Sequence, residues 1–317
     1  MSVANNDIKV RWYHKVGLEV LWALCRGIYF SPRWFRFYVL RPLFYVVLTL
    51  TRYRRNVILG NIRNSFPELS AAQTRHIMRR YRNTLAEVIV CTMSLAGAKP
   101  GRDNDLMTWE NVEEHLERTR GRDWIAMAAH FGCWEYLLLW CWHDPDCRFL
   151  GVYHPLRSTI FELFYRRLRN LAPNIIQTPM KDTMRYYLRN KGEDHGVVIG
   201  LISDQSPILR ADLEWHRFLN QDTVFVEGGE KFASRFHLPM YFVHVRRVAP
   251  GRYVARFDEL YDGVEEFAEG ELTHRYVRAL EDMIRETPEL WMWSHKRWKH
   301  TPEKQAAKFG IEKKVAK

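Results

Sequence analysis

The chain has 317 residues and a mass of 38.0 kDa, and 47% of its residues are hydrophobic, which excludes a disordered or tail-rich protein and leaves room for one large domain or two small ones. Lysine and arginine total 48 against 37 aspartate and glutamate, so the net charge of +11 favours an anionic partner such as nucleic acid, membrane phosphate or an acidic carrier protein. The five cysteines follow no disulfide-framework spacing, which favours a reducing compartment.

Bulky apolar and aromatic residues dominate the segment 10–50, which is therefore expected to be helical. Its apolar runs are interrupted by Glu19, Arg26, Arg36 and Arg41, whereas a bilayer-spanning helix needs about 18 or more apolar residues with few charges. We therefore predict amphipathic helices that lie in the membrane interface, with an apolar face among the acyl chains and arginines among the headgroups. The alternative is a set of buried helices in the core of a soluble protein.

A basic run, TRYRRNVILGNIRNSF, closes this segment, and the next helix is predicted over 71–94 with Ser70 as its N-cap. Short apolar runs then alternate with helical patterns. The expected strands cover 124–130, 148–153, 174–178, 196–203, 240–248 and 252–260. Helical spacing occupies 133–143, 158–170, 181–190, 228–237 and 273–286. The alternation predicts an α/β fold with a mixed, largely parallel sheet that is flanked by helices and has an antiparallel edge.

These patterns divide the chain into three regions. Residues 1–65 are expected to form a membrane-associated helical region, and residues 66–300 an α/β domain. Residues 301–317 are expected to form a flexible basic tail, because lysine-rich chain ends that nothing ties down usually fray.

The stretch WIAMAAHFGCWE ends an apolar run on His130 and returns to a carboxylate, Glu135, five positions later. Residues five apart in a helix lie about 140° apart around its axis, so these side chains can meet only across a boundary between elements. We predict that a strand ends near Ala129 and that Gly132 supplies the turn. Open α/β sheets place their sites at the carboxyl ends of strands. An imidazole held by a carboxylate is a general base for a hydroxyl, which suits acyl transfer to an alcohol.

Other interpretations of this stretch remain open. His130 could be a hydrogen-bonded core histidine, and Glu135 an ordinary carboxylate at a helix start. Cys133 could be a thiol nucleophile with His130 as its base, which would make the protein a thioester hydrolase. Cys141, His143 and Cys147 in CWHDPDC could suggest zinc, but no second ligand pair stands elsewhere, so no metal is expected.

Further candidate residues follow the later strands. Asp204 and Gln205 come after a strand-like run, so they are expected near the same sheet edge, where they would cap a turn or position a ligand. Gly228 and Gly229 precede a helix and could contact an oxyanion or a phosphate through backbone N–H groups, although an ordinary turn explains them equally well.

Five stretches, in order, resemble the lipid A biosynthesis late acyltransferases, a family within the lysophospholipid and glycerolipid acyltransferases that share a His-x4-Asp/Glu motif. They are RRNVILGNIRNSFPELS, AAHFGCWE, GVYHPLRSTIFELFYRRLR, LISDQSP and PELWMWSHKRWK. The resemblance covers most of the chain. It implies a bacterial inner-membrane enzyme whose site faces the cytoplasm and takes an acyl chain from acyl carrier protein. It also implies that His130 is the base and Glu135 its partner.

The chain departs from the family pattern in its second motif. The family usually has Tyr-Arg-Pro, whereas here Tyr153 is followed by His154 and Pro155, and Arg157 is the nearest arginine able to bind acceptor phosphate. Tyr153, His154, Arg157, Asp204, Gln205 and Gly229 are therefore expected to bind substrate. This departure leaves the acceptor open between a lipid A precursor and another lipid or a pigment precursor.

The predicted function is acyl transfer from an acyl carrier protein or coenzyme A thioester to a lipid hydroxyl, with no cofactor. Seven basic residues crowd the middle of the chain, and one or two of them are expected to touch ligand: Arg157, Arg166, Arg167, Arg169, Lys181, Arg185 and Arg189. Expected partners are acyl carrier protein, a phosphorylated glycolipid and the membrane surface. Nucleic acid is disfavoured, because the arginines are mixed with long apolar runs. A non-catalytic lipid-binding protein remains the alternative outside enzymes.

Overall fold

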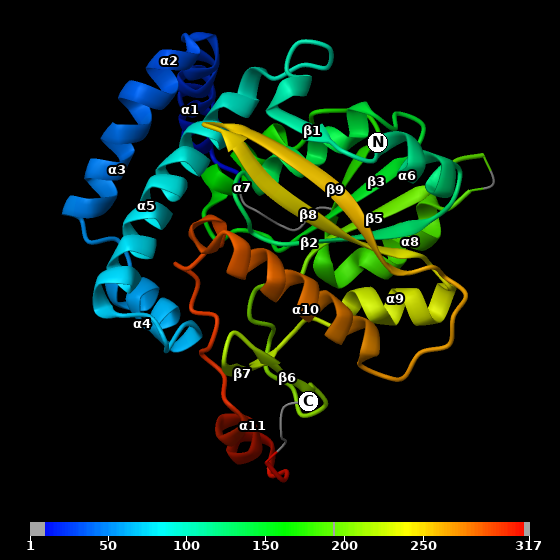
Figure 1. Ribbon diagram of the computed structural model, residues 1–317. Coiled ribbons are helices and arrows are strands. Elements are labelled where there is room, and N and C mark those ends of the chain that lie inside the picture. The colour runs from blue at the N-terminus through cyan, green and yellow to red at the C-terminus, as the bar shows by residue number, and fades with distance from the viewer. Residues whose placement is uncertain (1–9, 193, 314–317) are drawn as a thin grey trace.

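The computed structural model describes residues 10–192 and 194–313, which form an α/β fold (Figure 1). The main sheet has seven strands in the order β1, β9, β8, β2, β5, β3, β4. Neighbouring strands are parallel except for β8 and β9, which are antiparallel. The prediction of a mixed, largely parallel sheet flanked by helices is confirmed.

The strands of the main sheet are β1 (Met107–Trp109), β2 (Trp124–Ala128), β3 (Arg148–Tyr153), β4 (Ile175–Pro179), β5 (Val197–Ile202), β8 (Met240–Ala249) and β9 (Arg252–Tyr261). The six predicted strands match six of these to within two residues at each end, and β1 was not predicted. All five residues of β2 are buried, which explains their continuous apolar run, because strands covered on both faces need no polar side.

The helices are α1 (Trp12–Phe30), α2 (Arg33–Phe35), α3 (Arg41–Leu50), α4 (Arg55–Ser65), α5 (Ala71–Ser94), α6 (Val112–Thr119), α7 (Thr159–Leu168), α8 (Thr183–Asn190), α9 (Gly228–Phe236), α10 (Glu271–Glu286) and α11 (Pro302–Phe309). Figure 1 shows α1 to α5 gathered on one side of the sheet. The expected N-cap of α5 is confirmed: the Ser70 hydroxyl accepts a hydrogen bond from the Gln73 amide, and the Gln73 side chain accepts one from the Ser70 amide. The core is continuous from α1 to the sheet, since Cys25, Phe37 and Ile58 belong to the same buried cluster as β2.

The N-terminal helices carry apolar side chains on their exposed surface. On α3, Leu43, Val46, Val47 and Leu50 are exposed and follow the i, i+3, i+4, i+7 spacing of a single helix face. On α1 the exposed residues Trp12, Val16, Val20 and Leu24 follow a four-residue spacing. None of the helices in the described ranges is both long and apolar enough to cross a bilayer.

The structure corrects the prediction for the end of the chain. Residues 302–309, which are part of the predicted tail 301–317, form α11 instead, and residues 314–317 lie outside the described residues. Gln305 of this helix is fully buried; its side-chain oxygen accepts a hydrogen bond from the Trp215 indole at 2.7 Å, and its amide donates to the Arg210 carbonyl at 2.7 Å. These contacts hold α11 against a separate hairpin of β6 (Trp215–Phe218) and β7 (Gln221–Val224), which was not predicted either.

Candidate active site

His130 lies two residues beyond the end of β2, where the chain turns sharply. Gly132 makes this turn with a φ of +52°, and a side chain there would overlap the Tyr253 ring, so glycine is required for both reasons. The turn is held from the C-terminal part of the chain: the Gly132 amide donates to the Leu290 carbonyl at 2.8 Å, and the Met292 amide donates to the His130 carbonyl at 3.1 Å. The predicted turn at Gly132 is confirmed, and it fixes the backbone beneath the imidazole.

The partner of the His130 imidazole is Asp204, which follows β5, the strand beside β2 in the sheet. The Nδ1 atom of His130 lies 2.7 Å from Oδ1 of Asp204, and the second carboxylate oxygen accepts the His130 amide at 3.1 Å and the Trp291 indole at 2.8 Å. When the ring is neutral, a proton on Nδ1 can be donated to this carboxylate, and Nε2 is then the nitrogen that can accept a proton. The side-chain nitrogen of Gln205 lies 3.2 Å from Nε2.

Asp204 is 2% exposed, and it stays ionised despite this burial. Burial by itself would raise the pKa of Asp204, but the charge and hydrogen bond of His130 and the indole hydrogen bond of Trp291 outweigh it, and the pKa lies below its usual value. A buried carboxylate that remains charged at neutral pH can orient a neutral imidazole and stabilise the imidazolium that forms when the ring accepts a proton.

The predicted contact between Glu135 and His130 is wrong. Glu135 instead forms a two-pronged ion pair with Arg169, with distances of 2.9 Å from Nε to Oε2 and 2.6 Å from Nη2 to Oε1. The reason is geometric: residues 134–142 form a 3-10 helix, and Glu135 in its first turn binds the arginine that caps the end of α7. His130 and Glu135 therefore have different partners, Asp204 and Arg169, although both line one cavity.

A cavity of about 740 Å³, called the central cavity below, is lined by both His130 and Glu135. Many of its other lining residues are buried and aromatic, among them Trp109, Trp124, Trp140 and Phe257, whose rings pack at centroid distances of 4.7 to 6.3 Å from one another. The volume lies within the roughly 300–1,000 Å³ common for small-molecule sites, and the apolar walls suit a hydrocarbon chain.

Most of the predicted substrate-binding residues meet at this cavity. Tyr153, His154, Arg157 and Gln205 line it, and Asp204 lies behind His130. Gly229 is not among the lining residues; its Cα packs so closely on Met127 of β2 that a side chain would overlap the sulfur atom. The glycine therefore serves the packing of α9 against the sheet.

Two of the seven predicted basic residues, Arg157 and Arg169, line the central cavity. Among the others, Arg166 pairs with Glu162, Arg167 with Glu19 and Arg185 with Asp182, so these three bind carboxylates of the chain itself: the distances are 2.7, 2.8 and 3.0 Å. Arg157 is exposed and lines the same cavity as His154. Arg210 and Lys299, also exposed, line the cavity as well, and neither was a predicted site residue.

The geometry disfavours a Cys133 nucleophile. The Cys133 thiol is 3% exposed and is not among the residues that line the central cavity. Burial first, and then the neighbouring Cys91, raise the pKa of the Cys133 thiol well above its usual value, whereas a reactive cysteine needs a lowered pKa. Within residues 10–192 and 194–313, no group of three or more His, Cys, Asp or Glu side chains is arranged to hold a metal ion.

Two functional contacts were missed in the sequence. Arg169 was named only as one of seven basic residues, and Trp291 only as part of an aromatic and basic C-terminal motif. The pairing of His130 with Asp204 had a usable signal, because His130 ends one predicted strand and Asp204 directly follows another, and the ends of adjacent parallel strands meet at one sheet edge. The sequence did not reveal that these two strands were neighbours.

The α/β sheet thus carries a carboxylate-held imidazole at its carboxyl edge, in the wall of a largely apolar cavity. The family model of the bacterial lipid A biosynthesis acyltransferases matches residues 6–300. The chain belongs to this family and is an acyltransferase. A comparison with curated proteins gives no match.

Proposed function

We propose that the enzyme transfers a fatty acyl chain from an acyl carrier protein thioester to a hydroxyl group of a phosphorylated glycolipid of the lipid A type. The observation that carries this proposal is the 2.7 Å contact between Nδ1 of His130 and the Asp204 carboxylate, in the wall of a largely apolar cavity of about 740 Å³, which favours Nε2 as the proton acceptor. The acyl chain would occupy the aromatic part of the cavity, and the acceptor hydroxyl would lie beside Nε2.

In the proposed reaction His130 acts as general base. Nε2 takes the proton of the acceptor hydroxyl while its oxygen attacks the thioester carbonyl and forms a tetrahedral oxyanion. The oxyanion collapses, the carbon–sulfur bond breaks, and the departing thiolate takes the proton from the imidazolium. Asp204 stabilises the imidazolium between these steps, so no cofactor and no covalent acyl-enzyme are needed.

Arg169 is the proposed source of positive charge for the oxyanion. It lines the central cavity with His130, and the bidentate pair with Glu135 fixes its guanidinium in one orientation. A preorganised cation in a site that excludes water stabilises developing negative charge more than water does. Glu135 would then contribute to catalysis by positioning Arg169, which retains a role for the predicted carboxylate without a direct contact to His130.

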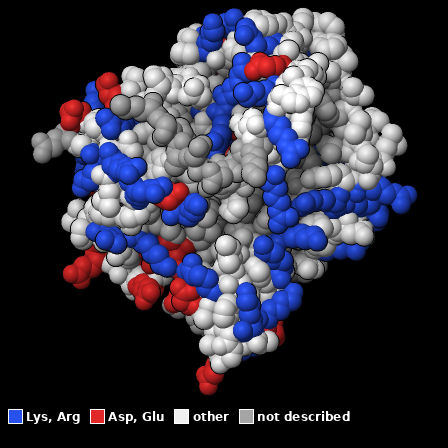
Figure 2. Space-filling view, turned by 180° about the vertical axis from the view of Figure 1, so that it is seen from behind, with Lys and Arg blue, Asp and Glu red and all other residues white. Residues whose placement is uncertain are grey.

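The surface charge supports anionic substrates. Lys and Arg side chains cover much of the face seen from behind (Figure 2). Arg157 and Lys299, both exposed, lie at the lining of the central cavity and are the proposed contacts for acceptor phosphate. An acidic carrier protein and a phosphorylated glycolipid would both be attracted to such a surface.

We also propose that the exposed apolar residues of α1 and α3 bind the cytoplasmic face of the bacterial inner membrane without crossing it. The double substitution Val46→Ser and Leu50→Ser is expected to lower binding to phospholipid vesicles by about 10²–10⁴-fold, since each buried Val or Leu contributes roughly 1.5–3 kcal/mol. Vesicle flotation measures this. The control, Val264→Ser, removes an exposed valine from a distant loop and should bind as the wild type does. Equal binding of all three proteins would rule out α3 as the contact.

The function is tested by acyl transfer in detergent micelles. Labelled acyl-acyl carrier protein and acyl-coenzyme A are offered separately, with a lipid A precursor or phosphatidylglycerol as acceptor, and mass spectrometry identifies the product. We expect an additional ester on the lipid A precursor, made faster from the carrier protein thioester. Acylation of phosphatidylglycerol alone would move the assignment to another lipid acceptor, and free fatty acid as the main product would indicate a thioester hydrolase.

A further inference from the structure

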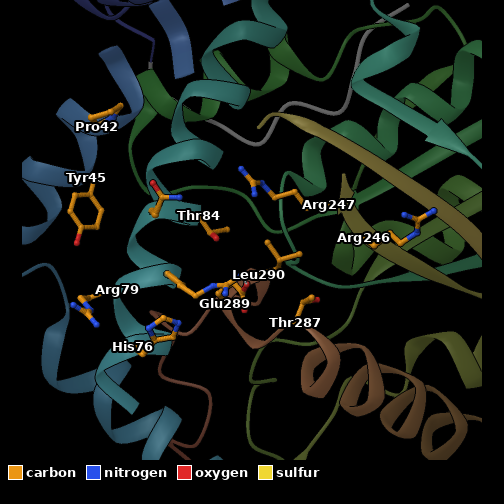
Figure 3. Close-up of a pocket in the computed structure, with 12 residues that line it drawn as sticks. Pro42, Tyr45, His76, Arg79, Thr84, Arg246, Arg247, Thr287, Glu289 and Leu290 are labelled. Carbon is orange, nitrogen blue, oxygen red and sulfur yellow. Dashed lines mark ion pairs between the residues drawn. The ribbon is translucent and has the colours of Figure 1, made fainter. Parts of the chain in front are cut away.

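A second cavity, of about 540 Å³, lies between α3, α5, the end of β8 and residues 287–290 (Figure 3). It shares no lining residue with the central cavity. Four arginines line it, against one carboxylate, Glu289; they are Arg79, Arg80, Arg246 and Arg247. We refer to it as the arginine pocket.

Three of these arginines have carboxylate partners. Arg80 pairs with Glu289 and Arg246 with Glu110. Arg247 binds the buried Glu87 through two contacts of 2.7 Å.

Arg79 differs from them. It is exposed on α5 and, within the part of the chain that the structure describes, has no ion pair. Figure 3 shows it with His76 on the same side of the pocket as Tyr45, while Arg246 and Arg247 lie on the other side. The lining therefore includes one guanidinium without a carboxylate partner among the described residues, together with the Asn83 and Thr84 side chains.

The apolar side of the arginine pocket is provided by α3. Pro42 and Tyr45 line the pocket, and they alternate along the helix with Leu43, Val46 and Val47 of its exposed apolar face. A ligand that filled the pocket with a charged group could thus continue along an apolar helix surface. A free inorganic anion would use the arginines and leave this surface unused.

We propose that the arginine pocket binds the phosphate headgroup of an anionic lipid whose acyl chains lie along α3. Arginine suits this role because its planar guanidinium donates paired hydrogen bonds to phosphate oxygens. The proposal rests on the proposed membrane contact of α3, but the site is separate from the one that carries out acyl transfer.

Residues in the wall of the arginine pocket also hold the turn that carries His130. Thr287, Glu289 and Leu290 line the pocket, and the Leu290 carbonyl accepts the Gly132 amide. The next residue, Trp291, donates its indole hydrogen bond to Asp204. A headgroup bound against residues 287–290 is therefore expected to slow hydrogen exchange of the Gly132 amide, a readout that does not require turnover.

The proposal is tested with the full chain in a zwitterionic detergent. Titration calorimetry follows binding of dihexanoyl phosphatidylglycerol, kept below its micelle concentration, with dihexanoyl phosphatidylcholine and inorganic phosphate as comparison ligands. We expect saturable binding of the phosphatidylglycerol, weaker by roughly fivefold in Arg79→Gln, the effect of one surface cation on an anionic lipid. Arg278→Gln removes an exposed arginine of α10 outside the pocket and should bind as the wild type does.

Each other result overturns the proposal. Phosphate that binds as tightly as the lipid would show an anion site, and phosphatidylcholine that binds equally would show that the charge is irrelevant. Equal losses in Arg79→Gln and Arg278→Gln would show a general charge effect. None of these outcomes affects the acyl-transfer proposal, because the binding assay contains no thioester and Arg79 does not line the central cavity.

Discussion

Replacing His130 with alanine is expected to lower the rate of acyl transfer by about 10²–10⁴-fold, the usual contribution of a positioned general base. The alanine side chain has no nitrogen to take the proton of the acceptor hydroxyl. The rate should fall in kcat, because the aromatic walls that would hold the acyl chain are unchanged. The assay is the initial rate of labelled acyl transfer in micelles, measured under saturating donor and acceptor.

A second variant guards against loss of folding. His130→Gln keeps an amide that can donate to Asp204, so the buried carboxylate retains a partner, but glutamine cannot act as a base. Both variants should lose activity while their thermal unfolding remains close to that of the wild type. If either one retains more than about a tenth of the wild-type rate, the imidazole is not the base.

Asp204→Asn is expected to reduce the rate by about 10³–10⁴-fold, as loss of the carboxylate does in other carboxylate–imidazole pairs. An asparagine can present its amide to Nδ1, which then accepts a hydrogen bond, so that Nε2 carries the proton and can no longer take one. The same assay measures this loss, and hydrogen exchange or thermal unfolding checks that the variant is folded.

Glu135→Gln is the matched comparison for Asp204→Asn, since both replace one carboxylate by an amide. Glu135 acts through Arg169, so we expect a smaller fall in rate, on the order of tenfold. The variant should also unfold more easily, because removing one partner of a largely buried ion pair leaves Arg169 uncompensated. If Glu135→Gln lowers the rate more than Asp204→Asn does, Glu135 is the functional partner of His130, as the sequence predicted.

Most strands of the sheet could be predicted because their amino-acid composition is typical of strands. β2 and β5 are short apolar runs bounded by turn residues, and β8 and β9 are joined by the turn Ala249–Gly251. The order of the strands could not be predicted, and this order decides which carboxylate reaches His130. Glu135 is near in sequence, but Asp204 is near in space because β2 pairs directly with β5.

The missed hairpin of β6 and β7 lacks the usual sequence signal for a tight turn. Leu219 and Asn220 at its tip have φ values of +48° and +59°, a conformation in which asparagine or glycine is expected and leucine is rare. Tertiary contacts impose it: Leu219 is fully buried, and its amide donates to Glu281 of α10 at 2.8 Å. A local pattern cannot predict a turn that distant residues stabilise.

The five cysteines have no role in the proposed reaction, but the rate at which they are alkylated reports local unfolding of the chain. All of them are buried: Cys25, Cys91, Cys133, Cys141 and Cys147. Burial raises the pKa of Cys25 to about 11 and raises the pKa of the Cys141 and Cys147 thiols as well, so in the folded protein these three thiols are neither accessible to an alkylating reagent nor present as thiolate. Alkylation therefore requires exposure of the core. Because Cys25 belongs to α1 and Cys147 lies next to β3, their separate rates distinguish release of the first helix from opening of the sheet.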